Sequence, residues 1–259
     1  MPVADVTGAR LHYRFDGPDD APVLLLSNSL GTDLRMWDPQ IPALAARYRV
    51  LRYDSRGHGQ SAVTHGPYDV ALLARDALGL LDALRIERVM FCGLSLGGMV
   101  GQWLGANAPQ RIARLALCNT AAHMGAPDAY NARIEAVGKG GMAAVVDAVI
   151  SRWYTPAFIA GAPAAIAKTR EMLLATPAAG YIAACAAVRD MDQRASAGRI
   201  GAPTLVITGT HDLATPPAAG RFLSETIAGA RYVELSAAHL SNIEAEAQFT
   251  RALAEFLAA

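Results

Sequence analysis

One short segment constrains this chain more than any other: the apolar run 89–92, followed by Gly93-Leu94-Ser95-Leu96-Gly97 and by helix-compatible residues. Gly-x-Ser-x-Gly between a buried strand and a helix predicts a sharp, strained turn that lifts the serine hydroxyl above a sheet. Strand and helix close together around such a turn, so Gly93 and Gly97 carry no side chain there. The N–H groups that open the helix favour an anion. The pattern therefore predicts that Ser95 is a nucleophile.

Two later loops supply the partners that such a serine needs. The strand predicted at 203–208 runs into Asp212, and the strand predicted at 231–235 is followed by His239. An acid and then a histidine, both after the serine, is the chain order typical of this motif, and functional groups lie beyond the carboxyl ends of such strands. We therefore predict that His239 takes the serine proton, and that Asp212 fixes the imidazole tautomer and stabilises the imidazolium.

The chain has 6 histidines, so His239 has alternatives. His211 precedes the acid instead of following it, and we interpret it as a loop residue beside the site. His12 lies in the alternating segment 10–15, which predicts the exposed face of a strand. His65 and His123 lie in loop-like sequence, and neither has a carboxylate at motif spacing.

Two further groups of polar residues receive structural interpretations. Asp54, Arg56 and His58 follow the strand predicted at 48–53, and we expect them to order their loop. Asp190 and Asp192 are alternative acids, but they follow an alanine-rich helical segment instead of a strand. We interpret them as a solvated boundary between two parts of the fold.

With these motifs, the chain resembles the α/β-hydrolase superfamily over essentially its full length. Within it, the chain is similar to the 3-oxoadipate enol-lactone hydrolases of the β-ketoadipate pathway, through the phrases at 26–32, 36–38, 92–99 and 152–158. The resemblance implies an α/β fold with a mostly parallel sheet, helices on both faces and an inserted helical lid. It also implies hydrolysis of 3-oxoadipate enol-lactone to 3-oxoadipate, in the degradation of protocatechuate and catechol, through a serine acyl-enzyme.

The resemblance also nominates an oxyanion hole. In α/β-hydrolases a backbone N–H after the third strand acts with the N–H that follows the nucleophile. Matching Asn28-Ser29-Leu30-Gly31 to the usual His-Gly-x-Gly nominates the N–H of Leu30, together with that of Leu96. One such donor typically contributes about 3–4 kcal/mol to transition-state stabilisation.

A small lactone that bears a carboxylate needs a charged or multi-donor partner when it is buried. Arg133 and Arg152 are candidates in the lid, Arg133 being the first choice, and a solvated position is the alternative for both. Trp153 either walls the pocket or fills the core of the lid. Asn28 and Ser29 complete the predicted substrate-binding set.

Composition excludes several classes of function. The chain of 259 residues has 23 basic and 23 acidic residues, which leaves no electrostatic footprint for nucleic acid or an anionic membrane. The first residues lack a signal-like segment, no apolar run is long enough to span a membrane, and an odd, sparse set of 3 cysteines favours reduced thiols. We therefore expect a cytoplasmic enzyme of unassigned oligomeric state, without nucleic-acid or membrane partners and without a metal or organic cofactor.

The predicted elements alternate along the chain. Strands are expected near 22–28, 48–53, 87–93, 112–119, 203–208 and 231–235, with helical segments between them, and segment 10–16 is expected as an antiparallel edge. Between 121 and 197 no strand pattern appears. We therefore divide the chain into a hydrolase core, residues 1–120 and 198–259, and a helical lid, residues 121–197.

Alternatives to the lactonase function stay open at this stage. A carboxylesterase or perhydrolase would use the same three residues on other acyl groups. A carbon–carbon bond hydrolase or a lyase would retain the serine and histidine, and a non-catalytic binding module would retain only the fold.

Overall fold

The computed structural model describes residues 2–259 and contains one sheet of eight strands in the order β1-β2-β4-β3-β5-β6-β7-β8. The two strands at the β1 end pair antiparallel and the other six run parallel. The strands are β1 (Val3–Val6), β2 (Ala9–Asp16), β3 (Val23–Ser27), β4 (Arg49–Tyr53), β5 (Val89–Leu94), β6 (Ile112–Cys118), β7 (Thr204–Gly209) and β8 (Arg231–Leu235). The predicted α/β class with a mostly parallel sheet is confirmed.

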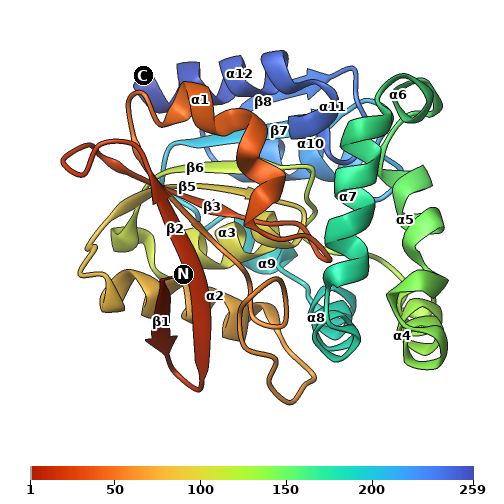
Figure 1. The fold of residues 1–259 in the computed structure, drawn as a ribbon. Helices are drawn as coiled ribbons and strands as arrows, with labels where there is room; N and C mark the ends of the chain where they lie inside the picture. The colour runs from red at the N-terminus through yellow and green to blue at the C-terminus, as the bar shows by residue number, and fades with distance from the viewer. Residues whose placement is uncertain (1) are drawn as a thin grey trace.

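The central strands are buried along their length because helices cover both faces of the sheet. Every residue of β5 and β7 is buried, which explains their continuous apolar sequences. Helices α1 and α12 lie on one side of the sheet, and α2 and α3 lie on the other (Figure 1). The helices outside the lid segment are α1 (Ile41–Leu44), α2 (Val70–Ala83), α3 (Leu96–Asn107), α10 (Pro217–Thr226), α11 (Ser241–Glu244) and α12 (Glu246–Ala258), with 3₁₀ turns at Leu34–Gln40 and Pro109–Arg111.

The chain between β6 and β7 contains helices and no strand in the sheet. Helices α4 to α8 gather beyond one end of the strands, at the right of Figure 1. All of these helices fall within the segment predicted as a lid: α4 (Asp128–Gly140), α5 (Val146–Trp153), α6 (Pro156–Gly161), α7 (Pro163–Ala175), α8 (Ala178–Asp190) and α9 (Arg194–Ala197), with a 3₁₀ turn at Met142–Ala144.

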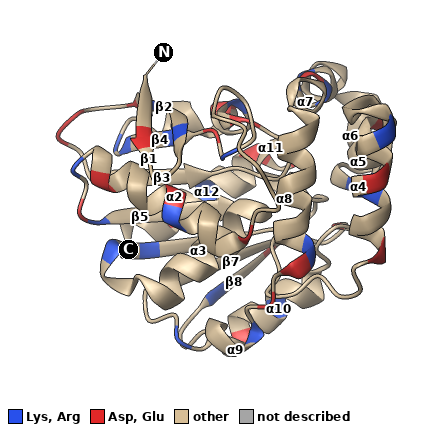
Figure 2. Ribbon diagram, turned by 90° about the horizontal axis from the view of Figure 1, so that it is seen from below, with Lys and Arg blue, Asp and Glu red and all other residues tan. Residues whose placement is uncertain are grey.

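No single helix in the described part of the chain is long and apolar enough to cross a membrane. One pair passes the length and composition test only when taken together, α7 with α8, which is bent by 97° at its break. Basic and acidic residues, 23 of each in the sequence, are interspersed along the outer helices and loops (Figure 2).

Two predictions about the first strands of the sheet are wrong. Segment 10–16 is antiparallel as expected, but it is not the edge, because the four-residue strand β1 pairs with its outer side and aligns Val3 with His12. The prediction that His12 is exposed is wrong: only 4% of its surface is accessible. Its Nδ1 lies 2.8 Å from Asp54 Oδ2. The loop after β4 therefore folds back over β2 and buries the imidazole.

The glycines around Ser95 allow β3, β5 and α3 to approach closely. A Cβ atom added at Gly93 would lie 2.1 Å from the Gly97 carbonyl oxygen. One added at Gly97 would lie 2.1 Å from the carbonyl oxygen of Ser27 at the end of β3. Backbone atoms block both positions, so no side-chain rotation could relieve the overlap.

We expect Gly97→Ala to lower the free energy of unfolding by about 3 kcal/mol or more, because overpacking against backbone forces strand and helix apart. Urea denaturation measures this change. The matched control is Gly138→Ala in α4, where an added Cβ meets nothing within 4 Å. That variant should gain about 0.5–1 kcal/mol from the higher helix propensity of alanine. Equal stability of Gly97→Ala and the parent protein would contradict the close approach.

Candidate active site

The turn between β5 and α3 holds Ser95 in a strained conformation. Its backbone has φ 58° and ψ −115°, in a region that residues with a side chain seldom adopt. The Ser95 N–H donates to the Cys118 carbonyl at 2.9 Å, and the Thr120 hydroxyl donates to the Ser95 carbonyl at 2.8 Å. Both bonds come from the end of the neighbouring strand β6. The sheet therefore enforces the turn that the sequence predicts.

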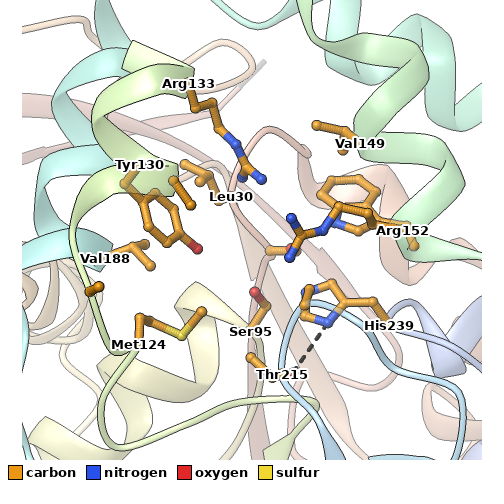
Figure 3. A pocket seen from close by; sticks show the side chains of 15 residues that line it. Leu30, Ser95, Met124, Tyr130, Arg133, Val149, Arg152, Val188, Thr215 and His239 are labelled. Carbon is orange, nitrogen blue, oxygen red and sulfur yellow. Dashed lines mark hydrogen bonds between the residues drawn. The ribbon is translucent and has the colours of Figure 1, made fainter. Parts of the chain in front are cut away.

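Asp212 and His239 meet although 27 residues separate them. His239 Nδ1 lies 2.8 Å from Asp212 Oδ2, and each residue is 2% exposed. This contact leaves Nε2 as the free ring nitrogen. His239 lines the same pocket as Ser95 (Figure 3). No hydrogen bond joins the two side chains in the described structure; such contacts often tighten only around a bound substrate.

The Asp212 carboxylate accepts several hydrogen bonds besides the one to His239. The backbone N–H groups of Ala214 and Thr215 donate at 2.7 and 2.8 Å, the Thr215 hydroxyl at 2.8 Å, and the Asn119 amide at 3.0 Å. Burial by itself would raise the pKa of Asp212, but the attraction of His239 and these donors outweigh it and hold the pKa below its ordinary value. Asp212 is therefore ionised and can stabilise a protonated His239.

Asn119 is a supporting residue that the sequence analysis missed. It follows β6 directly, with a left-handed φ of 43°. Its side-chain amide donates to Asp212 and, at 3.2 Å, to the Ala238 carbonyl. Its Oδ1 accepts from the Ser241 hydroxyl at 2.5 Å. Its place after a buried strand was the available signal, because the neighbouring strands also end in residues of this site.

Glu244 is a second missed residue, and it connects the His239 loop to the lid. Its carboxylate accepts from the Ala238 N–H at 2.8 Å and from both the N–H and the hydroxyl of Thr155. Thr155 caps α6, a lid helix. The loop that carries His239 is therefore held by the sheet on one side and by the lid on the other.

Two backbone N–H groups are free to bind an oxyanion. Neither Leu30 N–H nor Leu96 N–H has an acceptor among residues 2–259. The neighbouring groups are engaged, since Gly97 N–H donates to Asn28 O at 3.0 Å and Gly31 N–H donates to His58 Nε2 at 2.9 Å. Leu30 therefore lies in a loop whose next N–H is fixed by His58, and Leu96 opens a helix whose next N–H is fixed by that loop.

His58 orders this loop from the loop after β4. Burial lowers its pKa, so the ring is neutral near neutral pH. Its Nδ1–H donates to the Arg56 carbonyl at 3.1 Å, which leaves Nε2 as the acceptor for Gly31. Arg56 in turn forms a buried ion pair with Asp76. These contacts fit the structural role expected for Arg56 and His58.

The structure does not support the predicted role of Asn28 in substrate binding. Its side-chain amide donates to the Tyr53 carbonyl at 2.8 Å, and its Oδ1 accepts from Trp37 Nε1 at 2.9 Å. Both halves of the amide are therefore used within the protein, and Asn28 lies outside the pocket lining. Its side chain positions the loop instead of contacting a ligand.

The pocket above Ser95 is small, and the lid helices α4 and α5 form much of its wall. About 110 Å³ is open to solvent-sized molecules. The other predicted contact residues, Ser29, Arg133 and Trp153, all line it. Trp153 is buried, and its ring centroid lies 6.0 Å from that of His239. Helices of the segment predicted as a lid therefore line the space next to the serine.

Two arginines extend into this pocket without a carboxylate partner in the described structure (Figure 3). Arg133 is half-buried and lies over the ring of Tyr130, 5.1 Å from its centroid. Burial would lower the pKa of Arg133, but the neighbouring Tyr181 and Tyr130 hold it above the usual value, so the group stays charged. Arg152 donates to the Leu213 carbonyl at 3.0 Å. The pocket is therefore suited to an anion.

The alternative residues lie outside this arrangement. His211 is exposed, and only its backbone N–H is bonded, to the Ala237 carbonyl. Asp190 and Asp192 form surface ion pairs with Arg189 and Arg194. Residues 2–259 contain no cluster of three or more His, Cys, Asp or Glu side chains suited to a metal ion.

Known proteins of similar sequence and structure agree with this geometry. Residues 22–136 match the family model described as the alpha/beta hydrolase fold. The chain is 40% identical to 3-oxoadipate enol-lactonase 2 of Acinetobacter baylyi, over 94% of this chain and 91% of that protein. The chain belongs to the α/β-hydrolase family. It superimposes on the crystal structure of the enol-lactonase from Burkholderia xenovorans LB400 with a TM-score of 0.98, at 49% identity and with 100% of both chains covered.

A second group of α/β-hydrolases is similar at lower identity. The putative carbamate hydrolase RutD of Variovorax paradoxus is 34% identical over 96% of each chain. Family membership therefore establishes a hydrolase fold of the kind inferred from the elbow sequence, while the walls of the pocket distinguish one substrate class from another.

For this α/β-hydrolase we expect Asn119→Gly to lower kcat for a small activated ester by about 10- to 100-fold. A hydrogen bond to a charged group contributes about 1.5–3 kcal/mol, and glycine tolerates the left-handed backbone. Steady-state kinetics with a melting curve measure the effect. Asn107→Ala, which removes an exposed amide at the end of α3, is the control and should leave kcat close to the parent value. An unchanged kcat in Asn119→Gly would show that Asp212 needs no support from Asn119.

Proposed function

We propose that this protein hydrolyses 3-oxoadipate enol-lactone to 3-oxoadipate through an acyl-enzyme formed on Ser95. The observation that carries the proposal is the pocket itself, in which Ser95 and His239 share a small space with two guanidinium groups that no carboxylate among residues 2–259 neutralises. A small lactone with a carboxylate matches both halves of this pocket. The names and the similarity of the enol-lactonase relatives support the same reaction.

Acylation begins when His239 Nε2 accepts the proton of the Ser95 hydroxyl and Ser95 Oγ attacks the lactone carbonyl carbon. The carbonyl oxygen becomes an oxyanion that accepts from the N–H groups of Leu30 and Leu96. The bond between the carbonyl carbon and the ring oxygen then breaks. The proton on His239 passes to the departing enol oxygen, and the ring opens while the acyl group stays on Ser95.

Deacylation uses water in the place of the serine. His239 takes a proton from the water, whose oxygen attacks the acyl carbon, and the same proton then returns to Ser95 Oγ. The released enol tautomerises to a ketone. This tautomerisation removes the hydroxyl that could close the ring again, so opening is favoured in the direction of the free acid.

The substrate carboxylate is assigned to Arg133. Arg133 is half-buried and has no carboxylate partner within residues 2–259, so a bound carboxylate supplies a counter-ion that the described protein lacks there. Two parallel N–H···O bonds also fix the orientation of the ligand, and so place the lactone carbonyl against Ser95. Trp153 forms the adjoining wall beside His239.

We expect Ser95, His239 and Asp212 to act as one unit. Ser95→Ala and His239→Ala should each lower kcat by about 10⁴- to 10⁶-fold, and the double variant should lose little more, because triad members are not additive. Labelling with a fluorophosphonate followed by peptide mapping should locate the adduct on Ser95. His211→Ala is the control for the base and should retain most of the activity. An adduct on another residue, or equal damage from His211→Ala, would contradict the assignment.

We expect the enzyme to prefer the anionic lactone to its methyl ester. Arg133→Met keeps much of the side-chain volume and removes the charge, so kcat/KM for the acid should fall by about 10- to 100-fold, in line with the 1.5–3 kcal/mol of a charge-assisted hydrogen bond. The value for the methyl ester should change little. Steady-state kinetics on both substrates measure the two effects.

The control for that experiment is Arg170→Met. Arg170 is also a lid arginine, but it lies outside the pocket and pairs with Asp147 on the surface. Because exposed ion pairs contribute little, this variant should behave as the parent protein. Equal kcat/KM for the acid and its methyl ester in the parent would instead favour a general carboxylesterase or perhydrolase.

The proposal also covers the cellular compartment of the enzyme and the roles of its two parts. The three cysteines are free and buried, which supports a reducing compartment such as the cytoplasm. In this proposal the core and the lid at residues 121–197 have different functions. The core holds the reacting groups, and the lid helices hold the residues that select the substrate.

A further inference from the structure

The hydroxyl of Ser29 has no hydrogen-bond partner in the part of the chain that the structure describes. Ser29 is 2% exposed, its Oγ is buried, and no acceptor or donor reaches it within residues 2–259. The other hydroxyls of this segment are engaged, since Ser27 Oγ pairs with Tyr53 at 2.9 Å and Thr32 Oγ1 donates to the Ser29 carbonyl at 2.8 Å. Ser29 therefore differs from its neighbours in leaving a polar side-chain atom unused.

The position of Ser29 is fixed by its backbone. Its N–H donates to Met36 Sδ at 3.2 Å, and its carbonyl accepts from both the N–H and the hydroxyl of Thr32. Ser29 also lines the pocket that contains Ser95. A buried hydroxyl left unpaired destabilises a protein by about 1–3 kcal/mol, and a catalytic role is one reason why such a group is retained.

Ser29 immediately precedes Leu30, whose N–H is one of the two unpaired backbone donors of the site. Ser29 and Leu30 line the pocket from the loop after β3, and the unpaired N–H of Leu96 opens α3 directly after Ser95, which lines the same pocket. Three donors without acceptors match an oxygen atom that gains negative charge during the reaction.

We propose that the Ser29 hydroxyl is a third donor to the oxyanion, beside the N–H groups of Leu30 and Leu96. The inference rests on the acyl-transfer chemistry proposed above and deepens it. Ser29 keeps its proton throughout and forms no covalent bond. Its hydrogen bond strengthens as the carbonyl oxygen becomes negative, so it stabilises the transition state more than the bound substrate.

The substrate carboxylate is the competing partner for this hydroxyl, and the placement of charge argues against it. The guanidinium groups that suit a carboxylate come from α4 and α5, in the lid. Ser29 comes from the core, on the loop that carries an oxyanion donor. A carboxylate also has full charge before and after reaction, so that contact would act on KM, whereas an oxyanion contact acts on kcat.

The experiment compares Ser29→Ala and Ser29→Cys with the parent protein, on the enol-lactone and on neutral p-nitrophenyl acetate. Cysteine keeps the side-chain size but is a weak donor. We expect both variants to lower kcat on both substrates, the alanine variant on the order of 100-fold, with KM nearly unchanged. The melting temperature of Ser29→Ala should equal or exceed that of the parent, because the variant removes an unpaired hydroxyl.

Ser27→Ala is the matched control. It removes a buried hydroxyl two residues away that is paired with Tyr53 and lies outside the pocket, so it should lower the melting temperature and leave kcat unchanged. An unchanged kcat in Ser29→Ala, full activity in Ser29→Cys, or a loss confined to the lactone would each overturn the proposal. If the parent hydrolyses only the acetate ester, the proposed lactonase function fails, and the ester kinetics of Ser29→Ala still decide the role of the hydroxyl.

Discussion

The close contact of β3, β5 and α3 is the constraint on which the site depends. Gly93 and Gly97 remove the side chains that would separate these elements, and the backbone can then turn sharply enough to hold Ser95 at a positive φ. The same contact brings the Leu96 N–H beside the loop after β3 and bonds the Gly97 N–H to that loop. One set of packing contacts therefore positions the proposed nucleophile and the proposed oxyanion donors.

The polar and charged groups in the pocket differ in their partners from Asp212 and Arg56, which are paired within the protein. Asp212 is surrounded by donors and the buried Arg56 by a carboxylate, so each is satisfied before any ligand arrives. Arg133 and the Ser29 hydroxyl lie in the pocket without such partners. A folded protein tolerates unsatisfied buried groups at few positions, and the Ser29 hydroxyl on the wall of the pocket is one of them here.

The lid is joined to the catalytic loops by specific contacts. Glu244 bonds both Ala238, next to His239, and Thr155 in the lid. Gly31, with a left-handed φ of 81°, lies so near the lid that an added Cβ would meet a ring atom of Tyr181 at 2.9 Å. A change in lid packing would therefore reach the oxyanion loop and the base as well as the pocket wall. Contacts therefore connect the helices of the segment 121–197 to the loops that carry Leu30 and His239.

The sequence by itself determined the α/β class and the elbow at Ser95, and it nominated Asp212 and His239, which the structure brings into contact. These features depend on local patterns: apolar runs, glycines at set spacing and polar residues after strands. Only the tertiary structure decided the rest. It buried His12, turned Asn28 inward and brought Asn119 to Asp212 across 93 residues. Such contacts join segments far apart in the chain, and a side chain's partners follow from which surfaces pack together, which no local pattern encodes.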